Sequence, residues 1–181
     1  ICHQLNTKNN IISGSEVSRL SVAIQNDLNG VTDTRHVRSQ LLVEDILIKG
    51  VADWVRCNGL GSFNKIQVRN SQNMPSFSHH HWDLCAPSYV LPIAAVKKNG
   101  MNNGFFVADI IYGDLDSKSI QSYLTKVQRC RNMRNTRPFL AMLIAERFDK
   151  EGFRLAKQAG VMATTVSNLL GKDGSTANLL I

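Results

Sequence analysis

Apolar residues in the first third of the chain recur at the spacing of helices. In residues 15–30, "SEVSRLSVAIQNDLNG", they fall close to three or four positions apart, which predicts a helix that ends at Gly30. Residues 34–57, "TRHVRSQLLVEDILIKGVADWVRC", keep this spacing for roughly six turns, and Thr34 is a candidate cap. We therefore expect two N-terminal helices behind a polar leader, residues 1–15.

Between residues 63 and 112 the pattern changes to short extended pieces. They read "FNKIQVR", "HHWDLCA", "YVLPIAAVKK" and "GFFVADIIYG". Pro92 cannot donate a ladder hydrogen bond, so the third piece belongs at an edge or a bulge. The Asn-Gly signal in "KKNGMNNG" predicts a hairpin that joins the third piece to the fourth. This region is expected to form an antiparallel meander.

The last third alternates helical and extended patterns. A helix at about residues 117–131 is followed by a strand "PFLAMLIAE", a helix "KEGFRLAKQAG" with Asp149 as N-cap, a strand "VMATT" and a helix "VSNLLG". Strand, helix and strand in this order indicate parallel neighbours joined by a crossover. We expect one α/β domain over residues 1–181, with N-terminal helices followed by a mixed central sheet flanked by helices.

The composition agrees with a globular domain. The chain has 181 residues, of which 43% are hydrophobic and 19% charged. The longest apolar run, near residues 139–145, is too short to cross a bilayer, so we expect no membrane segment. The chain opens without a signal-peptide pattern, and its cysteines form no CxxC pair, which favours reduced thiols and the cytoplasm; they are Cys2, Cys57, Cys85 and Cys130.

The charge pattern favours a polyanion, and DNA in particular, as the partner. The net charge is +7 and the pI is about 9.5. Much of the excess lies in residues 125–137, "TKVQRCRNMRNTR", which contain no acid. The candidate nucleic-acid-binding residues are Arg129, Arg131, Arg134 and Arg137. On a helix these side chains would spread round the surface, so a solvated face is an equally good interpretation.

Asp109 is a lone carboxylate inside an otherwise apolar strand. Burial of a charged carboxylate requires a metal, a cation or hydrogen-bond donors. In a regular strand Asp109 shares one face with Phe105 and Val107. Asp83 lies on the extended piece before the hairpin, and two carboxylates on adjacent strands are the minimum for a Mg²⁺ site that activates water. In the alternative interpretation, Asp109 accepts hydrogen bonds from the following "YGDLD" turn.

The order of these features resembles the restriction-endonuclease-like, or PD-(D/E)XK, nuclease superfamily. The resemblance covers residues 37–170 and includes "ERFDKEGFRLAKQAGVMATT", where a helix leads to a last core strand. It implies a restriction-endonuclease-like fold, a Mg²⁺ cofactor and hydrolysis of DNA phosphodiester bonds. It also implies that Asp83 and Asp109 are the catalytic acids and metal ligands, with Glu44 as an acid on the preceding helix.

The family's lysine belongs two residues after the second acid, where this chain has Ile111. There a lysine would stabilise the attacking hydroxide and the developing phosphate charge. Lys97 and Lys98 on the hairpin and Lys126 on the next helix are the candidates to replace it. An alternative alignment on "IAAVKK" keeps Lys97 but loses the acid. The sequence leaves open an active deoxyribonuclease, an inactive nuclease-fold module for DNA or protein interaction, and a homodimer.

The stretch "SHHHWDLCA" also suggests zinc. In an extended chain His79, His81, Asp83 and Cys85 would share one face, with Trp82 on the other as a core aromatic. Same-face neighbours lie ~6.5 to 7 Å apart, so at most two could share one ion at a Zn–N distance of ~2.1 Å. A solvated histidine run is therefore favoured over zinc. His79 or His81 as a general base near Asp83 is a further alternative.

Overall fold

The computed structural model describes residues 34–70, 72–91, 93–97 and 100–171. The predicted leader and the predicted helix at residues 15–30 lie outside these ranges. The described elements are, in order, α3 (Thr34–Cys57), β1 (Gln67–Val68), β2 (Ser76–Phe77), β3 (His80–His81), β4 (Leu84–Ser88), β5 (Ala95–Lys97), β6 (Gly100–Asn102), β7 (Gly104–Leu115), α4 (Ile120–Asn132), β8 (Phe139–Phe148), α5 (Lys150–Gln158), β9 (Met162–Thr165) and α6 (Val166–Leu170).

A mixed sheet forms the centre of the molecule. Its strand order is β1-β4-β7-β8-β9. β4 pairs antiparallel with both β1 and β7, whereas β8 pairs parallel with both β7 and β9. This arrangement confirms the expected α/β class with a mixed central sheet, and the parallel strands follow helices as the crossover rule requires.

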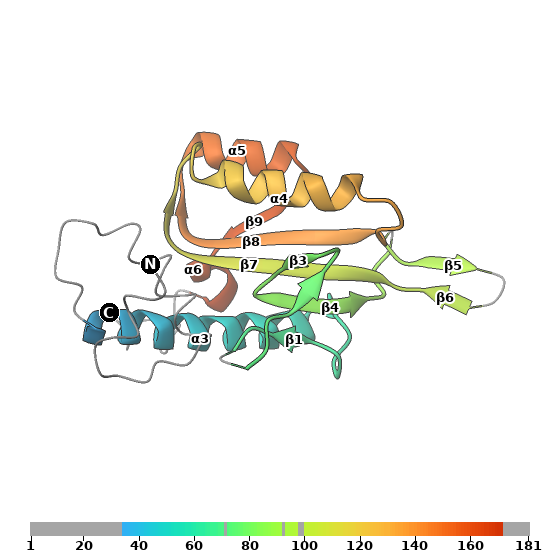
Figure 1. The fold of residues 1–181 in the computed structure, drawn as a ribbon, viewed down its shortest axis with the longest axis horizontal. Coiled ribbons are helices and arrows are strands. Elements are labelled where there is room, and N and C mark those ends of the chain that lie inside the picture. Colours follow the sequence, from blue (N-terminus) through green and yellow to red (C-terminus); the bar gives the residue numbers. More distant parts are fainter. Residues whose placement is uncertain (1–33, 71, 92, 98–99, 172–181) are drawn as a thin grey trace, which may run out of the picture.

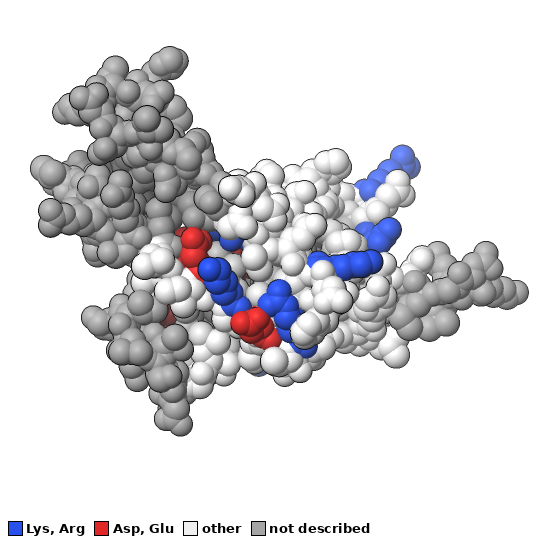
Figure 2. Space-filling view, turned by 90° about the horizontal axis from the view of Figure 1, so that it is seen from below, with Lys and Arg blue, Asp and Glu red and all other residues white. Residues whose placement is uncertain are grey.

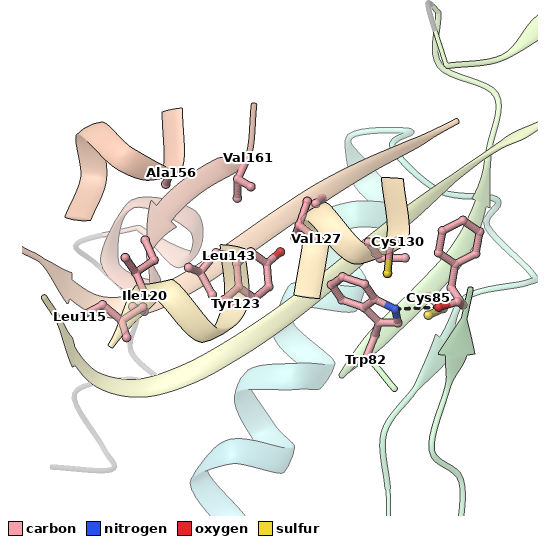
Figure 3. Packing of buried hydrophobic residues seen from close by; sticks show 14 residues of the cluster. Trp82, Cys85, Leu115, Ile120, Tyr123, Val127, Cys130, Leu143, Ala156 and Val161 are labelled. Atoms are coloured by element: carbon pink, nitrogen blue, oxygen red, sulfur yellow. Dashed lines mark hydrogen bonds between the residues drawn. The ribbon is translucent and has the colours of Figure 1, made fainter. Parts of the chain in front are cut away.

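Helices cover both faces of the sheet, with α3 on one side and α4 and α5 on the other (Figure 1). Successive side chains of β7 point to opposite faces of the sheet, so this strand contributes to the apolar layer on each side. Phe106 and Ala108 belong to the apolar cluster with α3, and Val107 belongs to the cluster with α4. On the α4 side, the cluster includes Trp82, which precedes β4, and Tyr123 and Val127 of the helix (Figure 3). The sheet is thus buried between two apolar layers.

β8 and α5 agree with their sequence patterns. Residues 141–145 of β8 are all buried, which explains why this strand has a continuous apolar run instead of alternation. The Asp149 side chain accepts a hydrogen bond from the Gly152 N–H, so the predicted N-cap of α5 is confirmed.

Three local predictions were wrong. "HHWDLCA" is not one strand, because Ser78 and His79 adopt positive φ values of 52° and 60° and turn β2 back onto β3. "YGDLD" does not end the long strand, since β7 continues to Leu115 with a register shift between Ile111 and Asp114. The reversal at Asn-Gly pairs β5 with β6, and this ribbon is separate from the central sheet.

Candidate active site

The two predicted acids meet where β4 begins alongside β7. Leu84 pairs with Ala108, so the next position in the antiparallel register places Asp83 opposite Asp109. The main-chain N–H of Asp83 donates to Oδ1 of Asp109 at 3.2 Å. Oδ2 of Asp83 accepts from the main-chain N–H of Ile110 at 2.8 Å. The carboxylates therefore lie at the acidic fork, the point where the pairing of β4 with β7 ends while β7 continues along β8.

Arg69, the residue after β1, joins this pair. The pairing of Val68 with Leu84 brings Arg69 level with Asp83, and its main-chain N–H donates to the Asp83 carbonyl at 2.7 Å. Its guanidinium bonds Oδ1 of Asp83 at 2.9 Å and Oε2 of Glu44 at 2.8 Å. Glu44, on α3, thus reaches the site through Arg69. Sequence reasoning missed Arg69, because only the register of the short strand β1 identifies it.

Lys126 brings a positive charge to the second acid from α4. Its Nζ lies 2.5 Å from Oδ2 of Asp109 and 3.9 Å from the centroid of the Trp82 ring. The apolar stripe Ile120, Tyr123, Val127 and Cys130 fixes the rotation of α4 against the sheet. Lys126 lies on the flank of this stripe, where it reaches the start of β4. Within the described part of the chain, Lys126 thus brings an ammonium group to the carboxylates.

Lys97 is positioned differently. It lies in β5 and pairs with Gly100 of β6, in the ribbon that extends from the Gly104 end of β7 (Figure 1). Asp109 is five residues further along β7, which corresponds to ~16 Å. The side chain of Lys97 and the whole of Lys98 lie outside the described part of the chain. The main chain of Lys97 therefore lies beyond the Gly104 end of β7, away from Asp109 in the middle of that strand.

Burial raises the pKa of Asp83 to about 6. The negative charge of Asp109 contributes to this rise, whereas Arg69 and the hydrogen bond from Ile110 oppose it. Two close carboxylates in a buried position favour either a shared proton or a bound cation. Burial also raises the pKa of the neighbouring Cys85 thiol to about 12, so this cysteine is a core residue and not a nucleophile.

The histidines do not converge on Asp83. The turn at Ser78 and His79 breaks the predicted alternation, so His79 and His81 are exposed while Asp83 and Cys85 are buried. Within the described ranges, no three His, Cys, Asp or Glu residues gather into a group that could hold a metal. Trp82 is only 2% exposed, which agrees with its predicted place in the core.

The four predicted nucleic-acid-binding arginines have different environments. Arg131 donates to the carbonyls of Ala159 and Gly160, the latter at 3.0 Å, and thereby ties α4 to the end of α5. Arg137 donates to Oδ1 of Asn103 at 3.3 Å. Arg129 and Arg134 are exposed. All four belong to α4 or to the loop after it, so they lie on the opposite side of the sheet from α3.

The face seen from below in Figure 1 is not uniformly basic. Figure 2 shows lysines and arginines there interspersed with acidic side chains, and much of the described surface is uncharged. Alternating signs give a weaker long-range attraction for a polyanion than a continuous basic patch. The run of arginines at residues 129–137 belongs instead to the α4 side.

The residues at the fork fit Mg²⁺. Asp83 and Asp109 supply four hard oxygen atoms, and an ionised carboxylate has about four acceptor positions, so the hydrogen bonds already present leave positions for a cation. Mg²⁺ is commonly held by one or two carboxylates with water and substrate phosphate as the remaining ligands. The raised pKa of Asp83 indicates that added positive charge would be favourable there.

The chain was compared with protein families, curated proteins and solved structures. No family model matches the chain, and no curated protein matches it. Among solved structures, a repair endonuclease from Pyrococcus abyssi aligns with 65% of this chain at 12% identity and a TM-score of 0.36. The aligned part spans 45% of that protein. In the described part of the chain, no helix is long and apolar enough to cross a membrane.

Proposed function

We propose that this chain is a metal-dependent deoxyribonuclease domain of the PD-(D/E)XK type. The observation that carries the proposal is the meeting of Asp83, Asp109 and Lys126 at one point of the sheet. Two carboxylates beside one lysine are the groups that hydrolysis of a phosphodiester needs: oxygen ligands for a hard cation and a cation for the developing phosphate charge. The basic α4 side supports DNA as the substrate.

Asp83 and Asp109 would hold Mg²⁺. When bound, Mg²⁺ lowers the pKa of its water and polarises the phosphate. The protein's own residues fix the positions of the reacting groups. The Ile110 N–H and Arg69 hold the two oxygens of Asp83, while the Asp83 N–H holds one oxygen of Asp109. The carboxylates are thus aligned before a substrate arrives, which reduces the reorganisation that catalysis requires.

Lys126 would take the role of the family's missing lysine. Ile111 is partly buried against the apolar cluster on the α4 side and cannot supply a charge. Lys126 Nζ reaches Asp109 from the helix instead, and the Trp82 ring beneath it restricts its position through a cation–π contact. On substrate binding, Nζ would donate to a nonbridging phosphate oxygen and stabilise negative charge in the transition state.

A second function has one specific observation in its favour. Arg69 and Lys126 already neutralise both acids, and such a closed set of ion pairs can serve fold specificity in place of catalysis. In that case the chain is a nuclease-fold module that binds DNA or protein without cleaving it. A module that binds DNA would differ from the nuclease in forming no cleavage products.

The test is cleavage of plasmid and single-stranded DNA with Mg²⁺ or Mn²⁺. We expect nicked or shortened products from the wild type and at least ~100-fold slower cleavage by Asp109→Asn, because a ligand and an orienting charge are lost. Asp114→Asn is the matched control on the same strand, where the carboxylate is exposed and pairs with Arg147. DNA binding without cleavage would favour the inactive module, and equal cleavage by Asp109→Asn would overturn the assignment of the site.

A further inference from the structure

A hollow opens at the C-terminal end of α4. Its volume is about 640 Å³, within the range of pockets that take small organic groups. Three segments that are distant in sequence form it: the β2–β3 turn, the start of β7 and the loop between α4 and β8. Its lining includes Phe77, His79, Phe105, Met133, Arg134 and Arg137.

The floor of the hollow is aromatic. The rings of Phe77 and Phe105 stack with centroids 4.6 Å apart and planes 28° from parallel. Phe139, the partner of Phe105 on β8, meets the Phe77 ring edge-on at 5.2 Å and so supports this pair. Phe105 is only partly buried, so part of its side chain remains accessible. Such a platform offers a planar heterocycle a surface for stacking.

The rim of the hollow is basic. Arg134 and Arg137 are exposed, and the guanidinium carbon of Arg137 lies 5.7 Å from the Phe105 centroid. His79 adds an exposed imidazole from the opposite turn. The described lining residues include no aspartate or glutamate. An aromatic floor with a rim of this charge complements a ligand that combines a planar base with an anionic phosphate.

The hollow and the acidic fork lie on the same side of the sheet. Phe105 and Asp109 share one face of β7, four residues apart, which corresponds to ~13 Å. α4 runs in the opposite direction, and Lys126 and Met133 are ~10 Å apart along it. Arg129, three residues after Lys126, lies on the same flank of the helix between them.

Trp82 connects the two places directly. Its indole N–H donates to the Phe77 carbonyl at 3.2 Å, the bond drawn in Figure 3, while its ring lies under Lys126. Buried Trp82 therefore contacts both the floor of the hollow, at Phe77, and the lysine of the acidic fork, Lys126. A strand that contacts Lys126 would need to span only a few nucleotides to reach the hollow.

We propose that the hollow binds an unpaired nucleobase of the same strand whose phosphodiester reaches Asp83 and Asp109. Phe105 stacks on the base, and Arg134 and Arg137 contact the phosphates beside it. A paired base inside a duplex cannot enter, so the substrate has a single-stranded segment next to the scissile bond. This inference rests on the proposed function and specifies the class of DNA.

The test measures binding of the full chain, without divalent cations, to oligodeoxythymidylate and to an abasic deoxyribose-phosphate oligomer of equal length. By fluorescence anisotropy we expect the wild type to prefer the oligomer with bases by about tenfold, because stacking requires a base. Phe105→Leu should bring this ratio close to unity. Arg134→Gln should weaken binding of both oligomers equally, whereas Arg147→Gln, an exposed arginine paired with Asp114, should change neither.

A second measurement uses the unaltered protein, in case Phe105→Leu does not fold. Photocrosslinking of a strand that contains 5-iododeoxyuridine should attach the base to Phe77, His79 or Phe105, as identified by mass spectrometry. Crosslinks confined to other residues, equal wild-type affinity for both oligomers, or a base preference that persists in folded Phe105→Leu would each overturn the role of the hollow. Absence of binding to any DNA would overturn the proposed function as well.

Discussion

The carboxyl group of Asp83 gives the site a pH response. Its pKa is raised from 3.8 to about 6 by burial and by Asp109. In this interval the folded protein binds a proton that the unfolded chain has released, so the free energy of unfolding attributable to Asp83 falls as pH rises from about 4 to about 6. Above that range the folded state holds a buried negative charge that a cation can stabilise.

We therefore predict that Mg²⁺ raises the melting temperature more at neutral pH than at about pH 5, because protons compete for Asp83 at the lower pH. Differential scanning calorimetry with and without Mg²⁺ measures this difference. Asp83→Asn should lose most of the response, while Asp114→Asn should keep it. A Mg²⁺ effect that is equal at both pH values would show that Asp83 is not the responding group.

Single residues also explain what sequence reasoning could identify at the site. Asp109 stood out because a lone acid in an apolar strand needs a partner, and Asp83 and Lys126 were among the expected partners. Arg69 was missed because its place depends on the register of the two-residue strand β1. The turn at Ser78 and His79 was missed because positive φ is uncommon without glycine or asparagine.

At the level of elements, the site gets its lysine from a helix and not from the strand that carries the second acid. β7 has Ile111 two residues after Asp109, on the same face of the strand, and α4 brings Lys126 to that acid. The chemistry depends on where the ammonium group lies, and either the strand or the helix can place it there. A lysine on β7 should therefore be able to replace Lys126 on α4.

We predict that Lys126→Met lowers the cleavage rate by at least ~100-fold, since a charge that stabilises the transition state is lost. Adding Ile111→Lys to this variant should restore part of the rate, because that position lies beside Asp109 on the same strand face. Lys118→Met, which removes an exposed lysine before α4, is the control. Single-turnover cleavage with Mg²⁺ measures all three. Full activity in Lys126→Met would remove this lysine from the site.

The helices and strands were largely predictable where a single pattern of apolar residues extends over many positions. The periodic apolar spacing of α3 and α4 and the apolar runs of β7 and β8 predicted those four elements close to their observed bounds. The region between β1 and β5 was less predictable, because its strands are two to five residues long and tertiary pairing decides their limits. The continuation of β7 to Leu115 depends on its parallel partner β8, which local sequence does not reveal.

For the whole molecule, the distribution of charge determines how DNA would approach. The net charge is +7, yet the face in Figure 2 carries both signs, and the arginine run lies on the α4 side. Arg131 is engaged with the end of α5, so it contributes to packing between helices. Arg129, Arg134 and Arg137 are then the expected phosphate contacts.

Such contacts predict a steep salt dependence. If three phosphates of a single strand are bound, the logarithm of affinity should fall with the logarithm of salt concentration at a slope of about −2. Arg134→Gln should reduce the magnitude of the slope by about 0.7, while Arg147→Gln should leave it unchanged. Anisotropy titrations over a range of NaCl concentrations provide the values. A slope near zero would mean that binding does not depend on phosphate contacts.

The most direct measurement of the metal site is a calorimetric titration of the full chain with Mn²⁺ or Mg²⁺ near neutral pH. Asp83 and Asp109 face each other across two strands, and together they should bind a divalent cation specifically. We expect saturable binding by the wild type and by Asp114→Asn, and a loss of at least ~10-fold in affinity in Asp109→Asn. Binding that is undiminished in Asp109→Asn, or no binding by the folded wild type, would contradict a metal site at these two aspartates.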